Sequence, residues 1–90
     1  MLEIVPSKQF KKDLKLAKKR GLQIDHLRYV INALAQQQKL ADSYRDHNLT
    51  GEYRGFRECH IEPDWLLVYR IDGDALELFL VRTGTHSDLF

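Results

Sequence analysis

Three histidines and one aspartate in the second half of the chain are the residues best suited to chemistry. They are His47, His60 and His86, three of the four histidines in the chain, together with Asp64. An imidazole with its ordinary pKa of about 6.5 can accept or donate a proton at neutral pH. Two histidines can therefore act as base and acid without a metal, while an aspartate orients one of the rings. Cleavage of RNA by attack of its own 2′-hydroxyl needs this pair of proton transfers.

RNA cleavage also needs cations that hold the phosphate and flat surfaces that hold an unstacked base. Arg57 and Arg82 lie in predicted strands, and their forked guanidinium groups suit phosphate oxygens. Trp65 and Phe90 offer aromatic faces for stacking. Each of these residues also has an ordinary structural interpretation. The arginines can be solvated or paired with neighbouring glutamates, Trp65 can belong to the core, and Phe90 can dock the last residues onto the sheet.

The local context of each remaining candidate leaves its role open. A single histidine near a strand end is often structural, and Asp64 after Pro63 is typical of a turn. Cys59 and His60 are neighbours in a predicted strand, so they point to opposite faces and form a poor nucleophile–base pair. His26 lies in the first turn of a predicted helix, where we expect a surface residue.

Length and composition predict a single domain over residues 1–90. The chain is 43% hydrophobic and 30% charged, which is typical of a soluble globular protein. No apolar run reaches the ~18 residues of a membrane span, and the first residues lack the basic-then-apolar order of a secretion signal. The single cysteine cannot form an internal disulfide. We therefore expect a cytoplasmic protein without a membrane partner.

The net charge of +1 hides an uneven distribution along the chain. Residues 1–20 contain seven basic and two acidic side chains, a net of +5, whereas residues 21–90 contain seven basic and eleven acidic side chains, a net of −4. A cationic first segment suggests contact with a polyanion. A solvated lysine face on an amphipathic helix explains this feature equally well.

The first half of the chain has the pattern of one strand and two helices. Residues 2–5 form a short apolar run that predicts a strand. Ser7 is a suitable N-cap for a helix over residues 8–20, and residues 24–35 repeat their apolar positions at helical spacing. Gly21 lies where the first helix should end. The two helices should form an antiparallel hairpin.

The second half has the pattern of an antiparallel meander after a polar loop at residues 39–52. We predict strands over residues 53–61, 65–71 and 76–83, separated by turns. The order is β-α-α-β-β-β, an α+β fold with both helices on one face of a small antiparallel sheet. Because the chain reverses at each hairpin, the three histidines can converge at strand ends.

Three runs of residues carry a resemblance to a known family. They are YRDHNL at 44–49, HIEPDW at 60–65 and RTGTH at 82–86, with Leu89 and Phe90 closing the chain. Together they closely resemble the YafQ-type toxins of the RelE/ParE superfamily, over essentially all 90 residues. The resemblance implies a microbial RNase-like fold and ribosome-dependent cleavage of mRNA in the A site. It also implies a cognate antitoxin that neutralises the toxin.

Carried over by position, the resemblance implies one set of functional residues: His47, His60, Asp64, Trp65, His86 and Phe90. Many RelE relatives use lysine, arginine and tyrosine instead, so their proton-transfer roles cannot be assumed here. We expect His86 to protonate the leaving group and His47 or His60 to act as the base, with Asp64 a further candidate for proton transfer. We expect no cofactor and no metal. The basic first segment should bind ribosomal RNA through Lys8, Lys11, Lys12, Lys15, Lys18, Lys19 and Arg20.

Three other functions fit parts of the same pattern. His47, His60, His86 and Asp64 could form a zinc site in a hydrolase, although no tight ligand spacing supports it. A ParE-like inhibitor of a DNA topoisomerase would share the fold class but would need no catalytic histidines. A structural or interaction domain without catalysis is the third alternative.

Overall fold

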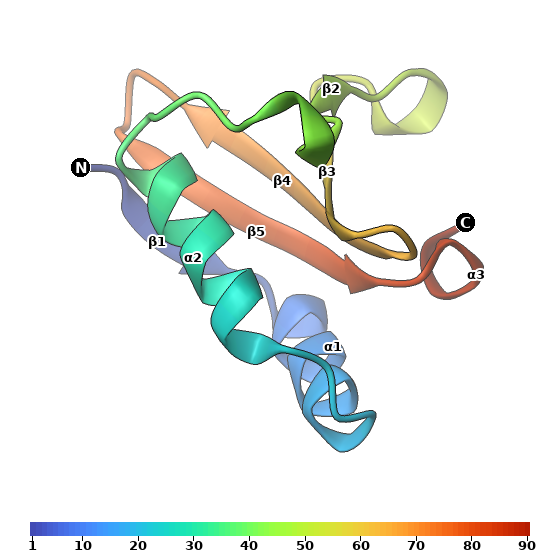
Figure 1. Ribbon diagram of the computed structural model, residues 1–90. Coiled ribbons are helices and arrows are strands. Elements are labelled where there is room, and N and C mark those ends of the chain that lie inside the picture. Colours follow the sequence, from blue (N-terminus) through green and yellow to red (C-terminus); the bar gives the residue numbers. More distant parts are fainter.

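The computed structural model describes every residue from Met1 to Phe90 and has one five-stranded sheet (Figure 1). The strands lie in the order β1-β5-β4-β3-β2, and all neighbours are antiparallel except β1 and β5, which are parallel. Their bounds are Glu3–Pro6 for β1, His47–Asn48 for β2, Arg57–Glu62 for β3, Trp65–Asp72 for β4 and Glu77–Gly84 for β5. The predicted α+β fold is confirmed.

Two long helices follow β1. Helix α1 spans Lys8–Lys19, and the predicted N-cap Ser7 accepts a hydrogen bond from the backbone N–H of Phe10. Gly21, with φ +74°, turns the chain into α2 at Ile24–Ala35. Figure 1 shows both helices beside the β1–β5 side of the sheet. No helix has the length and apolar character needed to span a bilayer.

The main core lies between the helices and one face of the sheet. Its buried side chains come from α1, α2 and the sheet residues that alternate toward them, as in Cys59 and Ile61 of β3. A smaller apolar cluster covers part of the opposite face and consists of Leu66, Val68 and Leu89. Because successive strand residues point to opposite faces, His60, which pairs with Leu66, lies on this second face.

The structure departs from the predicted elements in three places. Residues 53–56 are not strand, because a 3-10 turn (η2, Gly51–Tyr53) and Gly55 at φ +94° precede β3. The predicted loop contains a 3-10 turn (η1, Asp42–Tyr44) and the two-residue strand β2, which is too short to show a hydrophobic period. The predicted tail contains a one-turn helix, α3 (His86–Leu89).

Candidate active site

The three candidate histidines come from three elements but form one row on the second face of the sheet. His47 lies on β2 and His60 on β3, and their ring centroids are 6.5 Å apart. His86 begins α3, and its ring centroid lies 5.6 Å from that of His60. The side chain of His60 is 14% exposed, against 49% for His47 and 55% for His86. The two outer rings are therefore open to a substrate, and the middle ring lies deeper.

Asp64 lies in the β3–β4 turn and holds His86. Its Oδ1 is 3.0 Å from Nδ1 of His86 and also accepts the backbone N–H of that residue at 3.3 Å. These hydrogen bonds keep the pKa of Asp64 below its ordinary value. Because an ionised carboxylate only accepts hydrogen bonds, Nδ1 of His86 carries the proton. Nε2 is left for contact with a substrate.

Glu58 is a buried carboxylate between two of the histidines. It is 5% exposed, and its Oε1 lies 3.6 Å from Nε2 of His47 and 3.7 Å from Nε2 of His60. We did not select it from the sequence. The available signal was its position two residues before His60 in a strand, which places both side chains on one face.

Arg57 lies in a strand, as predicted, and its guanidinium group already has protein partners. It bonds Asp46 and Asn48, the two residues that flank His47, with Nη2 3.2 Å from Asp46 and Nη1 2.7 Å from Asn48. Its Nε also contacts the hydroxyl of the buried Tyr69, on the face of the sheet that the helices cover. A phosphate contact by Arg57 stays a prediction. Its contacts to Asp46 and Asn48 also fix β2 and the position of His47.

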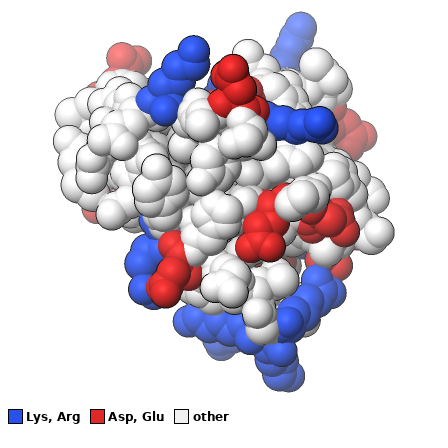
Figure 2. All heavy atoms as spheres, viewed as in Figure 1, with Lys and Arg blue, Asp and Glu red and all other residues white.

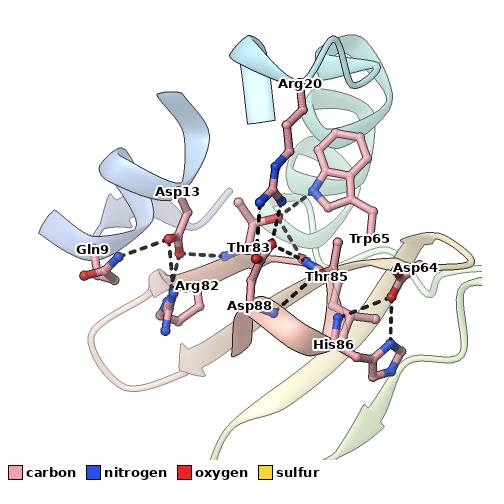
Figure 3. A network of polar contacts seen from close by, with 11 residues as sticks. Gln9, Asp13, Arg20, Asp64, Trp65, Arg82, Thr83, Thr85, His86 and Asp88 are labelled. Carbon is pink, nitrogen blue, oxygen red and sulfur yellow. Dashed lines mark hydrogen bonds and ion pairs between the residues drawn. The ribbon is translucent and has the colours of Figure 1, made fainter. Parts of the chain in front are cut away.

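Arg82 is held by a carboxylate from α1. Its Nε and Nη2 donate to the two carboxylate oxygens of Asp13 at 2.9 and 3.2 Å, and Asp13 also accepts the backbone N–H of Thr83 (Figure 3). Asp13 is 8% exposed and was not anticipated. Only Nη1 of Arg82 lacks a protein partner, so a phosphate contact by this residue stays a prediction.

Trp65 belongs to the core. It is 2% exposed, and its Nε1 donates to the hydroxyl of Thr83 at 2.9 Å (Figure 3). The prediction that its ring stacks on a base is therefore wrong, since the first residue of β4 faces the helices. Phe90 is 59% exposed and meets Tyr53 edge-on at 5.4 Å between ring centroids. Its role in stacking stays a prediction.

Arg20 connects α1 to α3. Its guanidinium nitrogens lie 2.6 and 3.3 Å from the two carboxylate oxygens of Asp88 (Figure 3). This contact holds the pKa of Asp88 well below its ordinary value. Asp88 also closes a capping box with Thr85 at the start of α3. The α3 turn that presents His86 is thus fixed at both its cap and its outer side.

The lysines predicted to bind ribosomal RNA are all exposed on α1. None of the six takes part in an ion pair, whereas Arg20 is paired with Asp88. Figure 2 shows basic side chains gathered at the lower end of the molecule, where Figure 1 places α1 and its turn into α2. These unpaired cations can meet a polyanion without breaking an internal contact.

Three side chains of the site could also bind a metal ion. Glu58, His60 and His86 each place one possible ligand atom within 4.8 Å of the others. One carboxylate and two imidazoles suit zinc or copper, so these residues could hold a metal ion after a small closing movement.

Burial raises the pKa of the Cys59 thiol to about 12. This thiol is therefore not a nucleophile at neutral pH.

Comparison with known proteins assigns essentially the whole chain to one family. Residues 2–90 match the family described as the bacterial toxin of type II toxin–antitoxin system, YafQ. The mRNA interferase toxin YafQ of Escherichia coli K12 is 40% identical over 89 residues, which cover 98% of this chain and 95% of the relative.

Two solved structures superpose closely on the chain. A metal-bound toxin from Helicobacter pylori has a TM-score of 0.94 at 51% identity, with 100% of both chains covered. YafQ in the Escherichia coli DinJ–YafQ complex has a TM-score of 0.90 at 40% identity, covering 100% of this chain and 99% of the other. The chain belongs to the YafQ family of bacterial type II toxin–antitoxin toxins.

Proposed function

We propose that the chain is a ribosome-dependent endoribonuclease, an mRNA interferase that inhibits translation. The observation that carries this proposal is the row of His47, His60 and His86 with Asp64 bonded to His86 at 3.0 Å. A base, an acid and an orienting carboxylate are the groups that 2′-hydroxyl attack requires. The relative with 40% identity is named an mRNA interferase toxin, which agrees with this chemistry.

The partners of the outer rings support different proton-transfer roles. Nδ1 of His86 faces a carboxylate, which stabilises the charged imidazolium and favours an acid. Nδ1 of His47 lies 2.6 Å from the carbonyl oxygen of Arg45, which can only accept. Nδ1 of His47 therefore carries a proton, and Nε2 is the atom that would take the proton of the 2′-hydroxyl, with the carboxylate of Glu58 3.6 Å away to stabilise the imidazolium that forms. His60 is the other candidate for the base.

In the reaction, the base removes the proton of the 2′-hydroxyl as its oxygen bonds to the adjacent phosphorus. The bond from phosphorus to the 5′-oxygen breaks, and His86 donates its Nε2 proton to that oxygen. The products are a 2′,3′-cyclic phosphate and a free 5′-hydroxyl. Phe90 and Arg82 would contact the base and the phosphate of the bound RNA.

The proposed partners follow from the family and from surface charge. The DinJ–YafQ complex of Escherichia coli supports a cognate antitoxin for this chain. The exposed lysines of α1 would dock on ribosomal RNA, because phosphate neutralisation dominates such affinity. A ribosome and mRNA as partners support a cytoplasmic location for the activity.

The metal-binding alternative rests on the cluster of Glu58, His60 and His86. A metal held there would supply Lewis-acid chemistry when bound. In the route proposed above, the same imidazoles transfer protons directly, so metal binding would block them.

The experiment that tests the proposed function is cleavage of mRNA on ribosomes programmed with a defined A-site codon, in excess EDTA. We expect cutting within the codon that leaves 2′,3′-cyclic phosphate ends, with His86→Ala as the inactive control. Loss of cutting in chelator with rescue by zinc, or products with 5′-phosphate ends, would favour a metal-activated water instead. Equal cutting of free RNA would contradict ribosome dependence.

A further inference from the structure

Strand β2, which carries His47, has little backbone pairing to hold it in place. It consists of two residues, and its register to β3 has only two pairs, His47 with Glu58 and Asn48 with Arg57. It is also the last strand of the sheet, so no strand covers its other edge. Strands usually have about five or six residues. The position of His47 therefore depends on the side-chain contacts of the residues beside it.

A tyrosine of the core supplies one of these contacts. Tyr69 of β4 is 1% exposed and belongs to the core that the helices cover. Its hydroxyl donates a hydrogen bond to Oδ1 of Asp46 at 2.5 Å, the length of a strong bond to a carboxylate. Burial raises the pKa of Tyr69, and the bond to Asp46 raises it further, so the hydroxyl keeps the proton that it donates. The single polar atom of this core side chain thus binds the residue before His47.

Arg57 extends this contact into a network that crosses three strands. It is the register partner of Tyr69, and its Nε donates to the Tyr69 hydroxyl and to Oδ1 of Asp46, both at 3.3 Å. Its Nη1 donates to Asn48, the residue after His47, at 2.7 Å. Because successive strand residues point to opposite faces, the network holds the neighbours of His47 from the helix side while the ring of His47 lies on the other face.

We propose that Tyr69 and Asp46 are positioning residues that fix His47 for proton transfer. The inference rests on the proposed function, since it gives them a role in RNA cleavage through His47. Neither residue touches the substrate. A displacement of about 1 Å at a reacting group can cost ~10²-fold in rate, so a small shift of β2 is enough to slow the reaction. The hydroxyl of Tyr69 connects the rigid core to the short strand that carries the base.

The test removes the hydroxyl of Tyr69 alone. Tyr69→Phe should slow single-turnover cleavage on programmed ribosomes about 10-fold, a fraction of the loss that full displacement causes, with unchanged ribosome affinity. The matched control is Tyr44→Phe, which loses a hydroxyl that lies 3.1 Å from Nε2 of His26 and should cut like wild type. This contact also leaves His26 half-buried, not the free surface residue expected from the sequence. If Tyr69→Phe does not fold, Asp46→Ala replaces it in the same test.

A double-mutant cycle separates positioning from general loss of stability. In a His47→Ala background, Tyr69→Phe should change the cleavage rate less than about 2-fold, because the residue through which it acts is gone. The loss of thermal stability should be the same in both backgrounds. Equal slowing in both backgrounds, or no slowing of the wild-type protein, would overturn the proposal and make Tyr69 a core residue only.

NMR of the free protein keeps this proposal distinguishable from the proposed function. The ring ¹⁵N signals of His47 should shift in Tyr69→Phe, whereas those of His26 should stay unchanged. Unchanged His47 signals would overturn the positioning role. Absence of cutting of any programmed ribosome by wild type would contradict the proposed function itself.

Discussion

His47 and His86 stand at opposite ends of the histidine row and are held by different means. His47 lies on a two-residue strand whose flanking residues are fixed by Arg57, and its own ring bonds a backbone carbonyl. The ring of His86 bonds the carboxylate of Asp64, and its helix is fixed by Arg20 through Asp88. The two rings are thus oriented by different groups, and we propose that this difference assigns the base role to His47 and the acid role to His86.

The largest expected effect comes from removing the acid at the His86 end. His86→Ala should reduce single-turnover cleavage on programmed ribosomes by about 10²- to 10⁴-fold, the usual contribution of a general acid. Ser87→Ala, the next residue of the same helix, is exposed and should cut like wild type. Antitoxin binding and thermal unfolding should be unchanged in both variants. A decrease of less than about 3-fold for His86→Ala would exclude it as the acid.

The second prediction concerns Asp13, whose hydrogen bonds with Arg82 and Thr83 hold the end of β5 that leads to His86. Burial would raise the pKa of Asp13, but hydrogen bonds from Arg82, Gln9 and a backbone amide outweigh it, and the pKa is lowered. A lowered carboxyl pKa stabilises the folded state above the ordinary value of about 3.9, and this contribution is lost as the pH falls through the lowered pKa. Asp13→Asn should therefore lower the free energy of unfolding by about 1–3 kcal/mol at pH 7.

Urea unfolding at pH 7 and pH 3 measures this difference directly. The difference in unfolding free energy between wild type and Asp13→Asn should shrink at the lower pH, where the carboxyl of the unfolded chain binds a proton and the folded state loses this advantage. Asp25→Asn changes an exposed carboxyl of α2 and should show a small effect at both pH values. An equal loss of unfolding free energy for Asp13→Asn at both pH values would mean that the charge of Asp13 does not stabilise the fold.

A smaller effect is expected when the carboxylate that holds His86 loses its charge. Asp64→Asn keeps an oxygen that can accept from Nδ1 but no longer stabilises the imidazolium, so cleavage should fall about 10-fold. The side chain of Asp64 is 69% exposed, and solvent limits its influence. The control is Asp74→Asn, an exposed turn residue. Identical rates for Asp64→Asn and wild type would assign Asp64 to the turn alone.

The smallest effect should follow from loosening α3. Arg20→Ala removes both contacts to Asp88 and should slow cleavage about 3-fold, while Lys19→Ala, an exposed unpaired neighbour, reports the loss of a ribosome-facing charge alone. Arg20→Lys should restore part of the rate. If Arg20→Ala and Lys19→Ala behave alike at every salt concentration, Arg20 acts on the ribosome and not on α3.

Local patterns predicted much of the fold and the residues of the row. Ser7 and Gly21 bounded α1 correctly because capping is encoded within a few residues. Strand β2 was missed because two residues cannot show a period. Strand β1 was predicted from its apolar run, but its parallel pairing with β5 departs from the expected antiparallel sheet and depends on long-range contacts. Neither the two-residue strand nor the parallel pairing leaves a local signal.

The errors at the site have a common physical cause. Trp65 was assigned to substrate from residue type, but its ring lies on the covered face of the sheet, bonded to Thr83. The partners of Arg57 in and beside β2 were not visible in the sequence either. Glu58 and Asp13 were missed because burial of a carboxylate depends on the finished fold. Residue type predicts what a group can do, whereas its partners decide what it does.

The most direct test of the account uses an RNA substrate whose 5′-oxygen leaving group at the cleavage site is replaced by sulfur. A thiolate leaves with little protonation, so an enzyme without its acid should recover on this substrate. We predict that His86→Ala regains most of its lost rate relative to wild type, whereas His47→Ala stays impaired. Equal impairment of both variants on the sulfur substrate would contradict the assignment of His86 as the acid.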